Sequence, residues 1–289
     1  MNGPAREHVT IVEMAPRDGL QNESHLVDTA DKIRLVDLLS DCGYERIEVT
    51  SFVSPKWVPQ MADAAEVMAG ISRRSGTRYA VLTPNMRGLE AAIDAQADEV
   101  AIFASASETF SQKNINCSIA ESIERFRLVA EICQQRGLML RGYVSCVVEC
   151  PYEGAIAPAS AAYVAGLLDD LGCYEVSLGD TIGRGTPEAV DRMLAKVLEG
   201  IPSERLAGHF HDTSGRALDN IAVALDRGLR VFDASAGGLG GCPYAPGAAG
   251  NVDTLTVNAF VAAKGFSTGL DAAKLEQAAA FARTLRSGQ

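Results

Sequence analysis

The fold is decided most clearly by residues 175–213, EVSLGDTIGRGTPEAVDRMLAKVLEGIPSERLAGHFHDT. This stretch opens with a short β-branched run, Glu175–Thr181, continues through a helical pattern at 187–199 and ends in a second run, Leu206–Thr213. The length of the two runs indicates strands, and the periodic apolar residues between them indicate an amphipathic helix. Two strands joined by a helix are expected to be parallel, because a parallel connection needs a long crossover. The stretch therefore predicts one β/α unit.

The same alternation of short run and helical pattern fills most of the chain. Eight predicted strands are each followed by a predicted helix, which is the order typical of a parallel sheet with crossover helices. A TIM barrel, an eight-fold (β/α) barrel of the α/β class, is the simplest closure of such a sheet. The predicted strands are Val9–Ala15, Arg46–Phe52, Arg78–Thr83, Glu99–Ser105, Leu140–Val148, Glu175–Thr181, Leu206–Thr213 and Val231–Gly237, and the predicted helices cover 30–41, 63–72, 87–96, 118–136, 160–171, 187–199, 217–227 and 252–263.

Length and composition fit one barrel. The chain has 289 residues, of which 47% are hydrophobic and 22% charged, enough to bury a large core without disulfides. No linker rich in proline and serine and no block of charge divides the chain. We therefore expect residues 1–289 to form a single domain, with 264–289 as a C-terminal appendage. The appendage contains an extra helix over Asp271–Arg286 that no strand precedes.

Charge and hydropathy exclude several classes of partner. With 26 basic and 37 acidic residues the formal net charge is −11, which repels a phosphate backbone, so we expect no nucleic-acid partner. No stretch approaches the roughly 18 apolar residues of a membrane span, and residues 1–8 lack the apolar region of a signal peptide. We expect no membrane contact and a cytoplasmic protein. Its seven scattered cysteines are then reduced thiols, mostly in the core.

Two histidines in the seventh predicted strand indicate a metal site. In a barrel, chemistry belongs at the carboxyl ends of the strands. His209 and His211 are two residues apart, so both imidazoles project from one face, about 6.6–6.8 Å apart along the strand. Joint ligation of a divalent ion is the favoured interpretation, and a core histidine held by a hydrogen bond is the alternative. An anionic third ligand is expected, and Asp18 is the best-placed candidate, although Asp-Gly pairs also form ordinary turns.

Three further side chains could act beside such a metal. Arg17 has a planar fork that suits a carboxylate, a thioester oxygen or a developing enolate, and its alternative role is a surface salt bridge. Glu48 either orients Arg17 or is a solvated strand residue. Asn251 either offers an amide oxygen to the metal or caps the helix that follows.

A glycine-rich loop follows the eighth predicted strand. Six of the residues 237–250 are glycine in GGLGGCPYAPGAAGN (237–251), so this segment could close over a ligand and open again. Cys242 lies in its middle between glycine and proline. Its thiol could be an acid, a base or a nucleophile, and the alternative is a chance unpaired cysteine.

Seven blocks of sequence together point to one family. On these blocks, which span nearly the whole chain, the protein resembles the hydroxymethylglutaryl-CoA lyases, in the superfamily of metal-dependent aldolase-like barrels. Isopropylmalate synthases and 4-hydroxy-2-oxovalerate aldolases share the metal pattern but not the second and the last block. One departure is Glu149, where some relatives have glycine, which puts the local loop in doubt. The blocks are PRDGLQNE (16–23), TSFVSPKWVPQMAD (50–63), KNINCSI (113–119), RGYVSC with CPYEG (141–154), EVSLGDTIGRGTP (175–187), GHFHDTSGRALDN (208–220) and VFDASAGGLGGCPYAPGAAGN (231–251).

The resemblance implies an activity. A lyase of this family cleaves (S)-3-hydroxy-3-methylglutaryl-CoA (HMG-CoA) to acetoacetate and acetyl-CoA in leucine breakdown, with Mg²⁺ or Mn²⁺ as the cofactor. A lyase for a longer branched 3-hydroxyglutaryl-CoA, a Claisen-type synthase and a non-catalytic barrel are the alternatives. As partners we expect an acyl-CoA substrate and further copies of the chain, in a dimer or a larger homo-oligomer.

The resemblance also implies roles for residues. Cys242 is the implied catalytic thiol, Arg17 with Glu48 stabilises the enolate, and His209 or Asp18 removes the hydroxyl proton. The anionic CoA ester is expected to meet Arg17, the metal and the cations Lys56 or Lys113. The implied metal ligands are Asp18, His209, His211 and Asn251, and the implied substrate contacts are Arg17, Gln21, Ser51, Tyr143 and Asp180.

Overall fold

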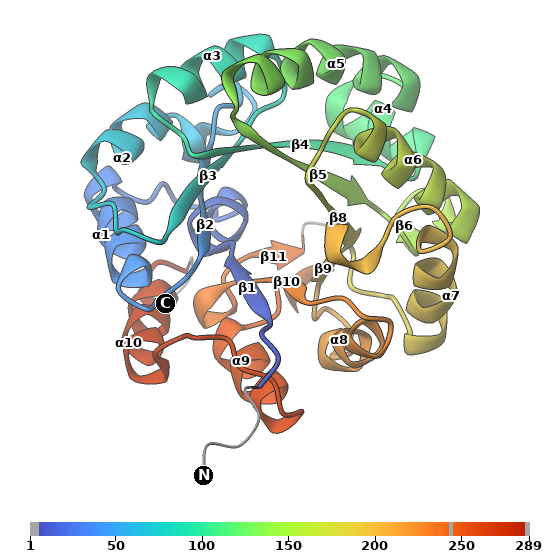
Figure 1. Cartoon of the computed structure of the whole chain (residues 1–289). Helices are drawn as coiled ribbons and strands as arrows, with labels where there is room; N and C mark the ends of the chain where they lie inside the picture. Colours follow the sequence, from blue (N-terminus) through green and yellow to red (C-terminus); the bar gives the residue numbers. More distant parts are fainter. Residues whose placement is uncertain (1–5, 243–244, 287–289) are drawn as a thin grey trace.

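The eight predicted strands form a closed parallel barrel (Figure 1). The structure, a computed structural model, describes residues 6–242 and 245–286, with side chains for all of these except 241–249. Neighbouring strands follow one another in the chain and the last pairs with the first, which confirms the predicted TIM barrel. The barrel strands are β1 (Thr10–Glu13), β2 (Arg46–Ser51), β3 (Arg78–Leu82), β4 (Glu99–Ser105), β5 (Met139–Ser145), β8 (Glu175–Asp180), β9 (Leu206–Phe210) and β10 (Val231–Ala234).

The seventh barrel strand is shorter than predicted. β9 ends at Phe210 and not at Thr213, because the chain leaves its barrel neighbours there. His211 stays extended through an isolated antiparallel bridge to Asn251, a pairing that sequence alternation does not encode. Two short antiparallel pairs outside the barrel were not predicted either. They are β6 (Glu149–Cys150) with β7 (Gly154–Ala155), and β11 (Gly241–Cys242) with β12 (Ala245–Ala249).

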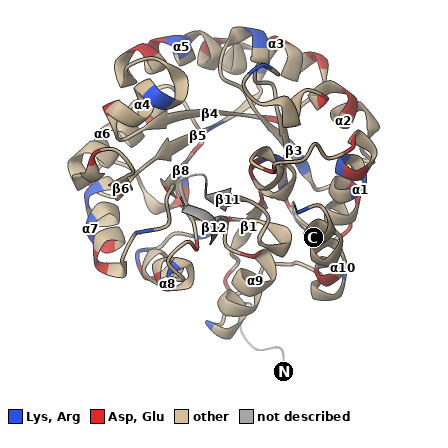
Figure 2. Cartoon of the chain, turned by 180° about the vertical axis from the view of Figure 1, so that it is seen from behind, with Lys and Arg blue, Asp and Glu red and all other residues tan. Residues whose placement is uncertain are grey.

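A ring of helices surrounds the barrel (Figure 1), and each predicted helix is present. Among the α-helices of the described residues, one was not predicted, α4 (Glu108–Ile115), because its sequence ETFSQKNI is mostly polar and has little apolar periodicity. Lys, Arg, Asp and Glu residues lie mainly along this outer ring (Figure 2). The ring consists of α1 (Thr29–Ser40), α2 (Ala64–Gly70), α3 (Met86–Asp94), α4, α5 (Ile119–Arg136), α6 (Pro158–Asp170), α7 (Pro187–Val197), α8 (Ala217–Asp226) and α9 (Thr254–Ala263).

The sheet separates two buried regions of different character. Outward strand residues such as Ile47 and Val100 join the helices in one large apolar core. The barrel interior holds a small apolar cluster that includes Met14 and Tyr143. It also holds buried charges, among them Arg46 paired with Glu175 at 2.7 Å. The interior is therefore partly polar, and its polar side chains connect to the carboxyl ends of the strands.

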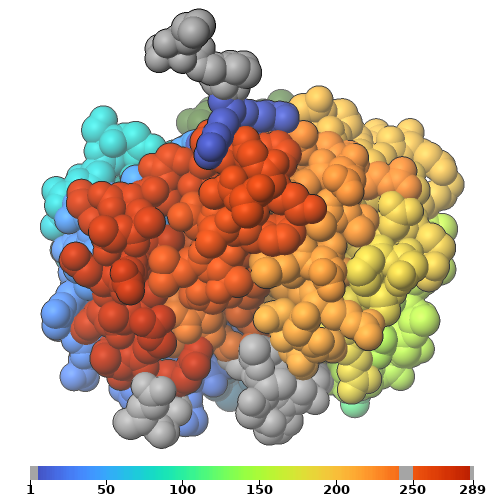
Figure 3. Space-filling model, turned by 90° about the horizontal axis from the view of Figure 1, so that it is seen from below, coloured from blue at the N-terminus to red at the C-terminus, as the bar shows by residue number. Residues whose placement is uncertain are grey.

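The extra C-terminal helix supports the glycine-rich segment. α10 (Ala272–Thr284) packs on α1 and on the short 3-10 turn Ala236–Gly238, and Figure 3 shows the red C-terminal residues beside the blue N-terminal ones. Arg286 donates hydrogen bonds to the carbonyl oxygens of Gly237 and Gly238 at 3.0 and 2.6 Å. The helix thus fixes the first residues of the predicted loop.

Two other expectations concern cysteines and membranes. Apart from Cys242, whose side chain lies outside the described residues, the described cysteines are free and buried, as predicted. Within residues 6–242 and 245–286, no helix is both long and apolar enough to cross a membrane.

Candidate active site

The loop after β1 carries Arg17 and Asp18. It forms a single π-helical turn, η1 (Ala15–Gly19), in which the Gly19 N–H donates to the Met14 carbonyl at 3.0 Å. A β-carbon at residue 19 would lie 2.9 Å from the side chain of Leu239, so only glycine lets the segment after β10 pack here. The Asp-Gly pair therefore belongs to a turn packed against a second loop.

Glu13, the last residue of β1, fixes the start of η1. Its buried carboxylate accepts hydrogen bonds from the backbone N–H groups of Ala15 and Ala236, at 2.8 and 2.9 Å. The hydroxyls of Tyr44 and Thr254 donate to the other carboxylate oxygen. Burial raises the pKa of Glu13 to about 7, because these bonds offset only part of the cost of burying the charge. Glu13 was not predicted from the sequence, where its only signal is an acid at the end of an apolar run.

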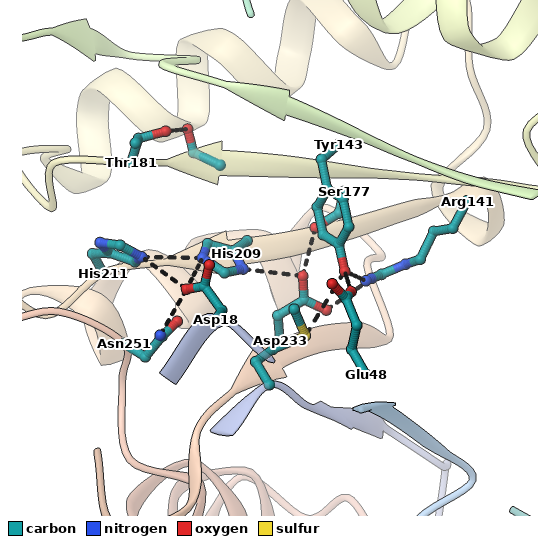
Figure 4. Close-up of polar contacts among 12 residues, drawn as sticks. Asp18, Glu48, Arg141, Tyr143, Ser177, Thr181, His209, His211, Asp233 and Asn251 are labelled. Carbon is teal, nitrogen blue, oxygen red and sulfur yellow. Dashed lines mark hydrogen bonds and ion pairs between the residues drawn. The ribbon is translucent and has the colours of Figure 1, made fainter. Parts of the chain in front are cut away.

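Asp18, His209 and His211 converge at the mouth of the barrel (Figure 4). The two Nε2 atoms are 3.1 Å apart, and Asp18 Oδ2 lies 4.0 Å from each. One nitrogen from each imidazole and one carboxylate oxygen lie within 4.8 Å of one another. Two nitrogens and an anionic oxygen are a donor set that suits a divalent cation. The structure thus places together the residues that the sequence proposed as ligands.

The protonation states suit a cation. His209 Nδ1 lies 3.1 Å from Asp233 Oδ2, and since a carboxylate only accepts, Nδ1 carries the proton. The Nε2 lone pair then faces His211. Burial and the nearby His209 lower the pKa of His211 to about 4, so its imidazole is neutral near pH 7. Two lone pairs 3.1 Å apart repel unless a proton or a cation lies between them. The residues therefore fit a bound metal ion.

Asp18 supplies the negative charge of this cluster. Burial alone would raise its pKa, but the neighbouring groups, chiefly the Arg17 guanidinium, outweigh burial and hold the pKa well below its ordinary value. The carboxylate is therefore ionised at any physiological pH.

Asn251 lies beside this cluster with its amide nitrogen toward Asp18. Nδ2 donates to Asp18 Oδ2 at 2.8 Å and to the Leu239 carbonyl at 3.3 Å. Ligation through the amide oxygen would require the amide to rotate by half a turn. The alternative as a helix cap is wrong, because Asp253 caps α9 through a hydrogen bond from Thr256 N.

Arg17 and Glu48 form a second group next to the metal residues. Arg17 Nε donates to Glu48 Oε1, and Nη1 donates to Asp18 Oδ1 at 2.5 Å. Tyr143 donates its hydroxyl proton to Glu48 Oε2 and lies edge-on to His209, with ring centroids 6.3 Å apart. Both Arg17 and Glu48 are buried, so a surface salt bridge and a solvated glutamate are both wrong.

The other proposed substrate contacts take different positions. Ser51 ends β2, and its buried Oγ has no hydrogen-bond partner among the described residues. Gln21 follows η1 and is half-buried. Asp180 ends β8, where its carboxylate accepts from the Gly185 and Arg184 N–H groups at 2.8 and 3.3 Å. Burial raises the pKa of Asp180 to about 6. In this structure Asp180 therefore stabilises the loop that follows β8.

Cys242 can be placed only by its backbone. It belongs to β11, which pairs with β12, and its side chain lies outside the described residues. At the base of this pair the Gly250 N–H donates to the Gly240 carbonyl at 3.1 Å. Gly240 has φ +107°, and a β-carbon there would lie 2.6 Å from Asn251 Nδ2. The segment that carries Cys242 therefore starts and ends beside the metal residues.

Three further buried residues that support the site were not predicted from the sequence. Asp233 in β10 orients His209, Ser177 in β8 donates to Asp233 Oδ2 at 2.8 Å, and Arg141 in β5 donates to Asp233 Oδ1 at 2.8 Å. A charged residue inside an otherwise apolar strand is the signal that could have identified Asp233 and Arg141.

Comparisons with known proteins agree on one family. A family model described as HMGL-like matches residues 8–282. The chain is 56% identical over 271 residues to a 3-hydroxy-3-isohexenylglutaryl-CoA/hydroxy-methylglutaryl-CoA lyase of Pseudomonas aeruginosa, covering 94% of this chain and 90% of that protein. A crystal structure of the HMG-CoA lyase from Brucella melitensis superposes with a TM-score of 0.96 at 64% identity, covering 97% and 99% of the two chains. An HMG-CoA lyase from Acinetobacter baumannii, in complex with coenzyme A and 3-methylmalate, gives a TM-score of 0.91 at 38% identity, covering 96% and 91%.

Proposed function

Because the chain belongs to the HMGL-like family, we propose that it is a carbon–carbon lyase that cleaves HMG-CoA to acetoacetate and acetyl-CoA. The observation that carries this proposal is the convergence of Asp18, His209 and His211 directly beside the buried Arg17–Glu48 pair. The first three residues can hold a cation that binds the substrate hydroxyl. The Arg17–Glu48 pair can stabilise the negative charge that develops on the thioester.

A divalent cation is the proposed cofactor. We propose Mg²⁺ or Mn²⁺, held by Asp18, His209 and His211, with Asn251 as a fourth ligand after rotation of its amide. Such an ion would polarise the tertiary hydroxyl of the substrate and lower its pKa.

Side chains of the protein are proposed to supply the base and to stabilise the enolate. His209 is the proposed base for the hydroxyl proton, because Asp233 and Asp18 outweigh burial and raise its pKa, whereas Arg17 keeps Asp18 a weak base. Because Nδ1 already carries the proton that faces Asp233, His209 would accept the hydroxyl proton with its Nε2 free, and Asp18, His211 and Asn251 would then hold the cation. As the bond between C2 and C3 breaks, its electron pair moves to the thioester enolate and the alkoxide becomes the ketone of acetoacetate. The Arg17 guanidinium stabilises that enolate in a buried site.

The direct test is product formation. Purified protein with Mn²⁺ is expected to release acetyl-CoA and acetoacetate from HMG-CoA in equal amounts, measured by chromatography, and a chelator should stop the release. Parallel assays with a longer 3-hydroxyglutaryl-CoA compare the two substrates. Absence of product from a metal-loaded protein would contradict the proposed reaction.

Cys242 is the proposed acid that protonates the acetyl-CoA enolate, and the prediction rests on the family resemblance and on the position of β11. Cys242→Ser is expected to lower kcat by about a hundredfold while the bound metal is retained, because a hydroxyl is a much weaker acid than a thiol. Steady-state kinetics and metal analysis of the same sample measure the two quantities. Cys133→Ser, at a buried cysteine on α5, is the control and should keep kcat. Turnover of Cys242→Ser equal to wild type would remove this thiol from the mechanism.

The loop after β2 is proposed to receive the CoA portion of the substrate. It contains Trp57, the single tryptophan of the chain, which is 78% exposed. Lys56 Nζ lies 5.5 Å from its ring centroid. The same loop lines a cavity of about 450 Å³ with Ser51 and Arg87. Lys113, the other candidate cation, lies 6.0 Å from the ring of Tyr152.

The single tryptophan provides a specific test. Coenzyme A is expected to quench the fluorescence of Trp57, and Lys56→Gln should weaken its binding by about fivefold, as expected for an exposed charge pair. Lys274→Gln on α10 is the matched surface control. Binding of CoA by calorimetry without any change in Trp57 emission would place the nucleotide elsewhere.

We further propose that residues 1–289 act as one catalytic domain with 264–289 as its appendage, in the cytoplasm, as a homo-oligomer that serves leucine breakdown. Light scattering coupled to size-exclusion chromatography tests the oligomer, because a monomeric mass at micromolar concentration would contradict it.

A further inference from the structure

The polar interior of the barrel centres on one side chain, Arg141 of β5, which is only 1% exposed. Its Nε donates to Glu175 Oε1 at 2.7 Å, its Nη1 to the Tyr143 hydroxyl oxygen at 2.6 Å, and its Nη2 to Asp233 Oδ1 at 2.8 Å. All three nitrogens of the guanidinium therefore have partners on different strands. Two of these partners lead to the candidate active site by separate routes (Figure 4).

The first route runs through Asp233 to the metal residues. Arg141 occupies Oδ1 of this carboxylate, and Oδ2 accepts from Ser177 Oγ at 2.8 Å and faces His209 Nδ1 at 3.1 Å. Because Oδ1 of Asp233 is bound to Arg141, the carboxylate group cannot rotate freely. Its Oδ2 therefore stays directed at the imidazole of His209. Such a partner fixes both the tautomer and the ring orientation of a metal-ligating histidine. We call this route the metal arm: Arg141, Asp233 and His209.

The second route runs through Tyr143 to the substrate residues. A guanidinium can only donate, so the Tyr143 oxygen must accept from Arg141 and use its own proton elsewhere. That proton goes to Glu48 Oε2, since Met14 Sδ at 3.8 Å is a weak acceptor. Glu48 Oε1 is then left for Arg17 Nε. We call this route the substrate arm: Arg141, Tyr143, Glu48 and Arg17.

From these contacts we infer that Arg141 is a positioning residue that sets the donor and acceptor directions of both arms and so couples the metal site to the enolate site. The predicted effect of Arg141 on catalysis rests on the proposed function, whereas its predicted effect on metal binding does not. A lysine cannot replace Arg141, because a single ammonium nitrogen cannot reach Tyr143 and Asp233 in the two directions that the planar fork provides.

Arg46 of β2 offers a matched control within the same barrel interior. It is 3% exposed and binds Glu175 through both terminal nitrogens, at 2.7 and 3.1 Å. It therefore shares burial, charge and the Glu175 partner with Arg141. Its described hydrogen bonds go to Glu175 and the Tyr174 hydroxyl, and not to either arm. If the interior arginines have only a structural role, substitutions of Arg141 and of Arg46 should lower Mn²⁺ affinity and kcat equally.

The experiment compares Arg141→Met and Arg141→Lys with Arg46→Met and Arg46→Lys. Mn²⁺ binding is followed by the paramagnetic resonance signal of the free ion, and kcat is measured at saturating Mn²⁺ and HMG-CoA. Both Arg141 variants are expected to bind Mn²⁺ about tenfold more weakly, as for loss of a group behind a metal ligand, and to lose about a hundredfold in kcat. Both Arg46 variants should stay within about threefold of wild type in both quantities. Circular dichroism establishes that each variant is folded.

Two further variants separate the arms and keep the test decisive if Arg141→Met fails to fold. Tyr143→Phe should lower kcat but leave Mn²⁺ affinity unchanged, whereas Asp233→Asn should weaken Mn²⁺ binding. In the Asp233→Asn background, Arg141→Lys should cause no additional loss of Mn²⁺ affinity, because the metal arm is already broken. Additive losses in that background would overturn the inference.

The outcomes also distinguish the inference from the proposed reaction. Equal loss of Mn²⁺ affinity in the Arg141 and Arg46 variants, or wild-type affinity in both Arg141 variants, would overturn the role of Arg141 whatever the reaction is. Tight Mn²⁺ binding by the wild-type protein without release of acetyl-CoA would instead overturn the proposed function and leave the metal arm in place.

Discussion

Replacing Arg17 by lysine is expected to lower kcat for HMG-CoA cleavage by about 10³-fold, the size of effect seen when one preorganised donor to a developing oxyanion is removed. In the structure Arg17 Nε donates to Glu48 and Nη1 donates to Asp18 at 2.5 Å. The second terminal nitrogen takes part in neither bond, and the rigid plane of the group fixes its direction. A lysine keeps the charge, but its one nitrogen cannot hold both carboxylates and also meet an enolate.

The control is Arg46→Lys, which removes the same planar fork from a buried arginine paired with Glu175 at 2.7 and 3.1 Å. Because Arg46 contacts no residue of the proposed site, this variant should keep kcat within about threefold of wild type. Steady-state kinetics at saturating Mn²⁺ measure kcat and KM for both variants. A kcat for Arg17→Lys within a factor of about ten of wild type would show that charge alone suffices at this position.

His211→Ala is expected to weaken Mn²⁺ binding by about 10³-fold, since loss of a ligand exceeds the loss of about 10–100-fold for a supporting group. His211 Nε2 lies 3.1 Å from His209 Nε2 and 4.0 Å from Asp18 Oδ2, so its removal leaves one imidazole and one carboxylate. The low pKa of His211, about 4, keeps its lone pair available near pH 7. Turnover at micromolar Mn²⁺ should fall in parallel and recover in part at high Mn²⁺.

His8→Ala is the matched control for this prediction. His8 is exposed, forms a hydrogen bond with Glu45 Oε1 at 2.7 Å, and precedes β1 at the opposite end of that strand from η1. The His8→Ala variant should bind Mn²⁺ as tightly as the wild type. The comparison therefore distinguishes the loss of a metal ligand from the loss of a histidine elsewhere in the protein. Full metal occupancy of His211→Ala, measured by elemental analysis after gel filtration, would refute ligation by His211.

The strands and most helices could be predicted because their signals are local. Alternation of short apolar runs with amphipathic segments does not depend on distant residues, so the barrel followed from the count and order of such segments. α4 was missed because it is short and polar, and it is held by Ser107, whose Oγ accepts from Phe110 N. The end of β9 was placed too late because pairing with neighbouring strands, and not residue type, decides where a strand stops.

For the candidate site, sequence motifs and the resemblance indicated residue types and not their orientation. Asn251 was proposed as an oxygen ligand, but its nitrogen faces Asp18, because the Leu239 carbonyl also needs a donor. Asp180 was proposed as a substrate contact, but its carboxylate binds the backbone of its own loop. Which lone pair or proton a side chain presents depends on partners that come from other strands.

By itself the sequence determined the order of strands and helices, the polar residues at the strand ends and the concentration of glycine around Cys242. Only the tertiary structure decided that Arg17, Asp18, Glu48 and His209 lie close together. It also decided that Arg141 connects to them through Tyr143 and Asp233. The physical reason is that periodicity and turn residues act over a few positions along the chain. The meeting of side chains instead depends on closure of the barrel and on the parallel register of strands far apart in sequence. The same closure brings Gly240 against Asn251, where a β-carbon at residue 240 would have no room.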